Sequence, residues 1–295
     1  MTTALLAGAS GDLGARTIRA LVARGADVRA LVRAGAGPEK TARLAGLGAT
    51  VVEADHDDPA DLRRAGEGAD VVVSTLNGLR EVMVDLQTRL LEAAVAAGVP
   101  RFVPSDFSAD YRRVAPGSNR NFELRRDFAR VLDRAPIRAT SVLNGAFADL
   151  LTGGAPIVLF DRGRVLHWGD PDQPMEFTTK DDAAAFTADA ALDDAAPRYL
   201  EIAGDVVTSR RLAQTMTELT GRRFRLTRAG TPGLVAGLAK VVRAVSRDDG
   251  SPFPPWQGMQ YLHSMVSGVA ELGPLDNDRY GPRDWTTARE VLAAR

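Results

Sequence analysis

The chain has 295 residues, of which 45% are hydrophobic and 25% are charged, as in an ordinary globular protein. Its 37 basic and 38 acidic residues leave a net charge of −1, so net charge predicts neither a nucleic-acid nor a membrane partner. The absence of cysteine excludes disulfides, thiolate metal sites and a cysteine nucleophile. Three scattered histidines without helical pair spacing predict no metal site. No apolar leader begins the sequence, which predicts a cytoplasmic protein.

The first candidate site is a glycine-rich turn near the start of the chain. An apolar run at residues 4–7 predicts a buried strand, and helical spacing of apolar residues from Leu13 predicts the helix after it. The glycines between them allow a sharp turn, a close approach to a pyrophosphate and close packing of helix on sheet. The helix N-terminus then faces the anion. A dinucleotide site is therefore predicted at Gly8, Ser10, Gly11, Asp12, Leu13 and Gly14. A strand-to-helix turn without a ligand is the alternative.

The end of the second predicted strand, residues 27–32, indicates which dinucleotide is bound. Arg33 follows this strand, nineteen residues after Gly14. An acidic residue here hydrogen-bonds the ribose of NAD, whereas an arginine suits the 2′-phosphate of NADP. The sequence therefore favours NADP(H), with a solvated surface arginine as the alternative interpretation.

Further candidates follow the third and fourth predicted strands. After the strand at 50–54, Asp55 is expected at the adenine edge, and His56 either lines the adenosine pocket or lies in an exposed loop. The next aspartates cap a helix at 60–65. The strand at 71–73 leads to three candidates for the phosphate and nicotinamide side, because loops at the carboxyl ends of parallel strands form the ligand crevice. They are Thr75, Leu76 and Asn77.

Strands and helices alternate through the first half of the chain, which predicts a doubly wound, parallel α/β sheet of the Rossmann type. The remaining elements are helices at 38–47, 81–97 and 119–130 and strands beginning at Arg101 and Ile137. We expect a dinucleotide-binding domain at 1–152, with sheet elements returning around 175–205, and a smaller, mainly helical substrate-binding part at 153–174 and 206–295.

The second half is predicted to contain a hairpin, a strand, a helix and a helix pair. The hairpin joins 157–160 to 164–168, the strand covers 200–203 and the helix covers 207–219; the helix pair covers 234–245 and 256–272, with a stiff loop between them. Apolar residues from Met259 to Val266 either cover a flat aromatic ligand or pack as an ordinary helix hairpin.

Several motifs together resemble the atypical short-chain reductases of the NmrA-like and isoflavone-reductase-like group. They are residues 8–14, 31–33, 55–59, 101–107, 140–147, 177–184 and 285–290. The resemblance implies an NADP-binding Rossmann domain whose C-terminal part closes over a substrate cleft. Enzymes of the group reduce aromatic or phenylpropanoid-like substrates, and other members bind the cofactor as redox sensors. The resemblance also implies cofactor contacts at Ser105, Asp106, Asn144 and Phe147.

Two departures from reductase patterns concern the proton donor. No tyrosine is followed four residues later by a lysine, the pair that ordinary short-chain dehydrogenases use. The isoflavone-reductase-like enzymes instead carry a lysine on the helix before the sixth strand, where this chain has Arg125, or Arg126 if the register slips by one. Arginine can stabilise negative charge but stays protonated. Either water or Tyr111 must then supply the proton.

Two functions therefore stay open at this point. The first is an NADPH-dependent reductase of a small, aromatic carbonyl or alkene substrate, with Arg125 and Tyr111 as catalytic residues. The second is an NADP(H)-binding redox sensor that acts through a protein partner. Sugar-nucleotide epimerisation is disfavoured, because it normally needs the tyrosine and lysine pair. Neither nucleic acid, membrane nor metal is expected as a partner, and a homodimer stays open.

Overall fold

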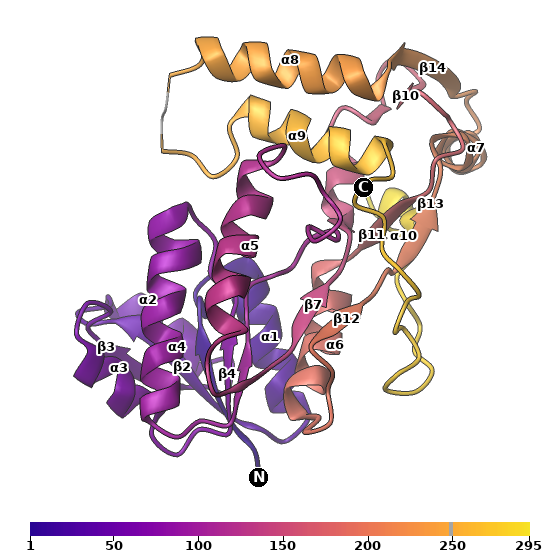
Figure 1. Ribbon diagram of the computed structural model, residues 1–295. Helices are drawn as coiled ribbons and strands as arrows, with labels where there is room; N and C mark the ends of the chain where they lie inside the picture. The colour runs from indigo at the N-terminus through magenta and orange to yellow at the C-terminus, as the bar shows by residue number, and fades with distance from the viewer. Residues whose placement is uncertain (248–249) are drawn as a thin grey trace. The chain divides into compact units, whose positions relative to one another are not determined.

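The protein is described by a computed structural model that covers residues 1–247 and 250–295 (Figure 1). The chain forms two compact units, with unit 1 made of Met1–Asp106, Leu124–Val142 and Ala183–Leu200. Unit 2 contains Phe107–Glu123, Leu143–Asp182 and Glu201–Arg295. The chain thus crosses between the units several times, whereas we expected a first boundary at residue 152. Asp248 and Asp249, at the start of the predicted stiff loop, lie outside the described residues.

Unit 1 is built on a six-stranded parallel sheet with the strand order β3-β2-β1-β4-β5-β6. This order is typical of dinucleotide-binding sheets, and it confirms the predicted fold class. The strands are β1 (Thr3–Ala7), β2 (Asp27–Arg33), β3 (Thr50–Ala54), β4 (Val71–Ser74), β5 (Arg101–Val103) and β6 (Arg138–Ala139).

Alternate residues of β1 face opposite sides of this sheet, as strand geometry requires. Leu5 and Ala7 pack in a core with α3, α4 and α5, and Ala4 and Leu6 pack in a second core with α1, α2 and α6. The helices are α1 (Asp12–Ala23), α2 (Pro38–Ala45), α3 (Pro59–Gly66), η1 (Glu81–Leu86), α4 (Gln87–Ala96), α5 (Arg120–Leu132) and α6 (Lys180–Leu192). Apolar residues thus cover both faces of the sheet, which explains why its strands are near-continuous apolar runs.

Two elements of unit 1 differ from the prediction. The helix expected at 81–97 begins with a π-helical turn, η1. In a π-helix the backbone hydrogen bonds join residues five apart in the chain, whereas in an α-helix they join residues four apart. The strand expected at 137–143 is interrupted at Thr140 and forms β6 and then β7 (Ser141–Leu143), which pairs with β12 (Tyr199–Glu201). Hydrophobic periodicity detects neither feature, since both depend on backbone pairing.

Unit 2 contains two three-stranded sheets, β14-β10-β9 and β13-β11-β8. The strands are β8 (Ala146–Phe147), β9 (Val158–Leu159), β10 (Arg164–Trp168), β11 (Met175–Thr178), β13 (Asp205–Val207) and β14 (Arg225–Gly230). The antiparallel β9–β10 pair confirms the predicted hairpin. β11 pairs with β8 and β13, and β12 with β7, so the strands expected to return to the parallel sheet lie in smaller sheets instead.

The helices of unit 2 largely follow the prediction. They are η2 (Ala148–Thr152), α7 (Ser209–Thr220), α8 (Pro232–Val245), α9 (Pro255–Val266) and α10 (Ala288–Ala293). α9 ends at Val266 rather than at residue 272, and α10 begins after Thr287, whose side chain forms a capping box with Glu290. None of the helices among the described residues is long and apolar enough to cross a membrane.

Close backbone packing surrounds the glycine turn in unit 1. Gly8 has a φ of +80°, a conformation that favours glycine. A Cβ at Gly14 would lie 2.3 Å from the Gly8 carbonyl oxygen and 2.9 Å from both the Ala9 Cα and the Thr75 Oγ1. Thr75 donates from its backbone N–H and its hydroxyl to the Ala7 carbonyl, at 2.9 and 3.0 Å. The turn is therefore clamped between β1, α1 and the residue after β4.

We predict that Gly14→Ala lowers the free energy of unfolding by about 2 kcal/mol, measured by urea titration. A Cβ that overlaps backbone atoms costs about 3 kcal/mol, which exceeds the helix-propensity gain of about 1 kcal/mol. Gly237→Ala on α8 is the matched control, because nothing lies within 4 Å of its added Cβ. That control is expected to gain stability, and a stable Gly14→Ala protein would contradict the clamped turn.

Candidate cofactor and substrate site

The glycine turn ends at the N-terminus of α1, which no side chain caps. Gly11 is the N-cap residue, and its N–H donates to the Gly8 carbonyl at 3.0 Å. A Cβ added at Gly11 would meet only the Gly8 carbonyl oxygen, at 3.3 Å, so its outer side is open. Ser10, Gly11 and Asp12 are exposed, and the Asp12 carboxylate accepts from Arg16 at 2.9 Å. The residues present therefore fit a pyrophosphate at an open, uncapped helix N-terminus.

Two basic side chains come from elements that neighbour this turn. Arg33, at the end of β2, is exposed. Arg43 of α2 donates from Nη2 to the Ser10 carbonyl at 2.8 Å, so its guanidinium lies against the turn. Sequence reasoning missed Arg43, because its distance from the turn along the chain gives no signal before α2 is packed. The carboxyl end of β2 and α2 thus supply cations on the side where NADP carries its 2′-phosphate.

The loop after β3 is organised by its own aspartates. Asp55 accepts from the Asp57 N–H at 3.0 Å, and the Asp58 side chain caps α3 as predicted. His56 is half-buried, and its Nε2 has no hydrogen-bond partner among the described residues. Burial first, and Arg33 next, lower the pKa of His56 below its usual 6.5. A neutral imidazole with an unused ring nitrogen therefore lies near Arg33.

The candidate residues after β4 and β5 form hydrogen bonds with the glycine turn or with one another. Thr75 clamps the glycine turn, and the Leu76 carbonyl accepts from the Ser105 hydroxyl at 2.6 Å. Ser105 is buried, and its N–H donates to Gln87 on α4. Asn77, by contrast, is exposed. These bonds join the loops after β4 and β5 into one rigid edge, with Asn77 presented to solvent.

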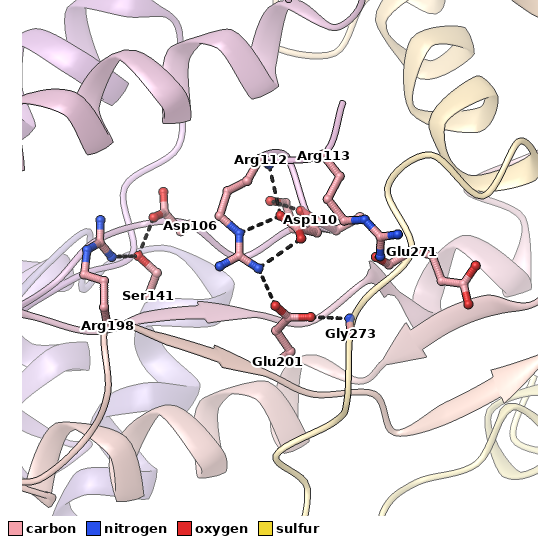
Figure 2. A network of polar contacts seen from close by, with 11 residues as sticks. Asp106, Asp110, Arg112, Arg113, Ser141, Arg198, Glu201, Glu271 and Gly273 are labelled. Atoms are coloured by element: carbon pink, nitrogen blue, oxygen red, sulfur yellow. Dashed lines mark hydrogen bonds and ion pairs between the residues drawn. The ribbon is translucent and has the colours of Figure 1, made fainter. Parts of the chain in front are cut away.

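Asp106 belongs to a buried polar chain in unit 1 (Figure 2). Its carboxylate accepts from the Ser141 hydroxyl at 2.6 Å, and that hydroxyl lies 2.6 Å from Nη1 of Arg198. Arg198 also binds Asp133 at 2.8 Å. Because the structure already gives Asp106 these partners, it orders the end of β5, and its contact with a cofactor stays a prediction.

Asn144 and Phe147 lie in unit 2, Asn144 two residues before β8 and Phe147 at its end. The Asn144 N–H donates to the Ser108 carbonyl at 2.9 Å, and its carbonyl accepts from Thr178 at 2.7 Å. The side-chain amide is fully buried, yet neither its Oδ1 nor its Nδ2 has a partner among the described residues. Lys180 lies over the Phe147 ring, with Nζ 5.8 Å from the centroid. A fixed residue with an unsatisfied amide has donor and acceptor groups available for a polar ligand.

Tyr111 is buried in unit 2, at 1% exposure, between Asp110 and Arg112 in a turn that charged residues hold. Asp110 accepts from Arg112 at 2.7 and 2.9 Å, and Arg112 also pairs with Glu201. Glu201 in turn accepts from the Gly273 N–H. These bonds raise the pKa of Arg112 still further above its usual value. The network therefore fixes Tyr111 and ties the C-terminal segment to the same unit.

Arg125 lies on α5, in the part of that helix that belongs to unit 1, and is half-buried. The apolar residues of α9, which were expected either to cover an aromatic ligand or to pack in a helix hairpin, mostly pack. Met259, Leu262 and Met265 contact the apolar core of unit 2. Tyr261 packs edge-on against Phe122, with ring centroids 5.2 Å apart. The simpler interpretation of that surface, an ordinary packed helix pair, thus fits most of its residues.

Comparison with known proteins gives the relationships of this chain. The model of the NmrA-like family matches residues 2–247. Pinoresinol reductase 1 from Arabidopsis thaliana is 30% identical over 260 residues, which cover 81% of each chain. The chain belongs to the NmrA-like family. An isoflavone reductase homolog from Zea mays is 31% identical over 240 residues, 75% of each chain. The fold of the present chain is similar to that in the solved structure of AtPrR2 with NADP+ and (+)-pinoresinol, with a TM-score of 0.82 and 24% identity. The match covers 99% of this chain and 98% of AtPrR2.

A further buried acid in this NmrA-like protein escaped the sequence analysis. Glu176 lies on β11 between two core residues, Met175 and Phe177, so its side chain points to the other face of the strand. Burial, and after it repulsion by Glu271, raise its pKa to about 7, although hydrogen bonds from the backbone and the charge of Arg113 oppose this rise. A charged residue inside an apolar strand was the only available signal.

We predict that Glu176→Gln flattens the pH dependence of stability between pH 4.5 and about 7. Because the folded-state pKa is raised, the native protein binds more protons than the unfolded chain in this window, and stability falls as pH rises. The shift corresponds to about 3 kcal/mol, the stability that the variant should gain relative to wild type above pH 7. Urea unfolding across this range measures it, with exposed Glu92→Gln as control. Parallel wild-type and Glu176→Gln profiles would contradict the shift.

Proposed function

We propose that this NmrA-like protein is an NADPH-dependent reductase of small aromatic substrates that works by hydride transfer. The observation that carries the proposal is the open, uncapped N-terminus of α1 behind the clamped glycine turn, with Arg33 and Arg43 beside it. Relatives at about 30% identity are named pinoresinol reductase and isoflavone reductase homolog. Pinoresinol and isoflavones are aromatic compounds, which supports the substrate class.

Each part of the cofactor has a set of residues that would hold it. The α1 N-terminus and the glycine turn would bind the pyrophosphate, and Arg33 the 2′-phosphate, with Asp55 and the neutral His56 at the adenosine. The unsatisfied amide of Asn144 and the ring of Phe147 would hold the nicotinamide. NADPH, when bound, supplies the hydride for the substrate carbon.

The chain's own residues would then manage charge and protons. Arg125 would stabilise the negative charge that develops on a substrate oxygen, because a fixed guanidinium donates hydrogen bonds without losing its proton. Tyr111 or a water would deliver the proton that Arg125 cannot. The turn around Tyr111, held by Asp110, Arg112 and Glu201, would keep that hydroxyl in place.

A redox sensor of the NmrA type is the second candidate, and one observation favours it. The motif spacing predicts Arg125, or Arg126 if the register slips by one, at the position where isoflavone-reductase-like enzymes carry a lysine, and this arrangement would leave the chain without the titratable cation of those enzymes. A sensor needs the cofactor site but no proton donor. It would bind NADP(H) tightly, act through a protein partner and turn over no substrate.

We predict that Arg33→Ala removes the preference for phosphorylated cofactors. Calorimetric titration of wild type with NADPH, NADP+, NADH and NAD+ should show tighter binding of the first two by about tenfold to a hundredfold, the value of a charge-assisted contact to phosphate. In Arg33→Ala the four affinities should converge. Arg19→Ala, an exposed arginine on α1, is the control. An unchanged preference would remove Arg33 from the site, and no binding at all would refute both candidate functions.

We predict that Arg125→Ala lowers kcat about a hundredfold, the usual effect of removing one donor to a developing oxyanion. NADPH affinity should stay unchanged. Arg125→Lys should keep activity and add a basic limb to the pH–rate profile, because lysine can titrate. Arg126→Ala is the matched control on the same helix, and a loss there instead would place the role at residue 126. Tight NADPH binding without turnover of pinoresinol or isoflavones would favour the sensor.

A further inference from the structure

His56 lies at the same end of the unit 1 sheet as Arg33. Ala54, the last residue of β3, pairs with Arg33, the last residue of β2. His56 follows Ala54 by two residues, so the loop that carries the imidazole neighbours the end of β2. The imidazole is half-buried, and its buried Nε2 has no hydrogen-bond partner among the described residues. An unused ring nitrogen is therefore placed at the end of the sheet where Arg33 is exposed.

Hydrogen bonds fix the loop around His56 from inside and from α4. Within the loop, Asp55 accepts from the Asp57 N–H at 3.0 Å. Arg89 of α4 donates from Nε to the His56 carbonyl at 3.0 Å, and its Nη2 pairs with Asp57 at 3.2 Å. The backbone of His56 is thus tied to a helix outside its own loop, which holds the imidazole near Arg33.

Charged groups from three elements act on this imidazole. Arg33 on β2 and Arg89 on α4 disfavour its protonated form, whereas Asp55 and Asp57 in its own loop favour it. Burial is the largest cause, and Arg33 the next, that keep the pKa of His56 below its usual value. Part of the lowering therefore comes from the positive charge of Arg33, and an anion bound to that guanidinium would reverse this part.

The two dinucleotides differ in the charge that they would bring to this place. The 2′-phosphate of NADP, like other phosphomonoesters, carries close to two negative charges above about pH 6, which exceeds the single positive charge of Arg33. A protonated imidazole near it is attracted instead of repelled, and both of its ring nitrogens are then donors. NAD has a hydroxyl group at the same position and brings no such charge. The protonation of His56 therefore depends on which dinucleotide is bound.

We propose that His56 is a specificity-determining residue that takes up a proton when NADP(H) binds, so that the preference for the phosphorylated cofactor strengthens as the pH falls. A group that gains proton affinity on binding makes binding tighter at lower pH, by linkage. The inference rests on the proposed contact between Arg33 and the 2′-phosphate, and it does not depend on reductase activity. The phosphate itself takes up a proton near pH 6, so the contribution of His56 is the difference between wild type and a variant without the imidazole.

Proton NMR of the full chain, free and saturated with NADP+ or NAD+, tests the proton uptake directly. The chain has three histidines, and the imidazole signal that is lost in His56→Gln identifies His56. With NADP+, the midpoint of its titration should rise by about one pH unit above that of the free protein, the effect of a nearby opposite charge. With NAD+ it should rise much less. A rise with NADP+ that is no larger than the rise with NAD+ would overturn the proposal.

Calorimetric titration measures the consequence for cofactor choice. Between about pH 7.5 and 5.5, the ratio of NADP+ to NAD+ affinity should rise about fivefold more in wild type than in His56→Gln, as linkage requires for that change in proton affinity. His56→Arg carries a permanent charge, so it should bind NADP+ tightly and show the pH dependence of His56→Gln.

A second histidine provides the matched control. His263 on α9 in unit 2 is also half-buried, and burial lowers its pKa as well. His263→Gln should keep the pH dependence of wild type. Parallel profiles of wild type and His56→Gln, or an equal loss of pH dependence in His263→Gln, would overturn the role of His56 and leave the cofactor site intact. Absence of binding by both dinucleotides would instead refute the proposed function together with this inference.

Discussion

The close approach of β1, α1 and the residue after β4 is the constraint on which the rest of unit 1 depends. Gly14 lacks a side chain because the Gly8 carbonyl occupies that space, and Thr75 locks the same turn through two bonds to Ala7. α1 can therefore begin directly at the edge of the sheet. Its uncapped N-terminus then points its dipole and N–H groups out of the turn, which makes the site suited to an anion.

Around that turn, electrostatics sorts the neighbouring residues by role. Arg33 is exposed and carries a permanent charge, which together with burial keeps His56 neutral. Arg43 is bound to the turn itself. In unit 2, by contrast, Arg112 forms ion pairs with both Asp110 and Glu201, so its charge stabilises the loop rather than binding a ligand. An arginine that carboxylates already satisfy thus holds a loop, whereas the exposed Arg33 is suited to an anionic ligand.

Two features of the chain show what the presence or the sum of charges does not determine. The first concerns proton transfer, and the second concerns net charge. Arginine at position 125 carries a permanent charge but is a poor proton donor, so a reductase that used Arg125 as we propose would have to obtain its proton elsewhere. Residues 222–247 show the second point, because they contain seven of the 37 basic residues and none of the 38 acidic ones in a chain whose total charge is −1. Summed charge is therefore a poor guide to partners when the charges are segregated.

Local patterns in the sequence determined the parallel sheet, the glycine turn, the family and the position of Arg33, because strand runs, glycine spacing and motifs act within a few residues of chain. Only the tertiary structure decided which residues meet over long separations. It placed Arg43 on the turn and interrupted the sixth strand at Thr140. It also buried Glu176 beside Glu271 and left Leu238 and Val241 of α8 exposed. Burial and long-range pairing arise from packing between elements, which no single window of sequence contains.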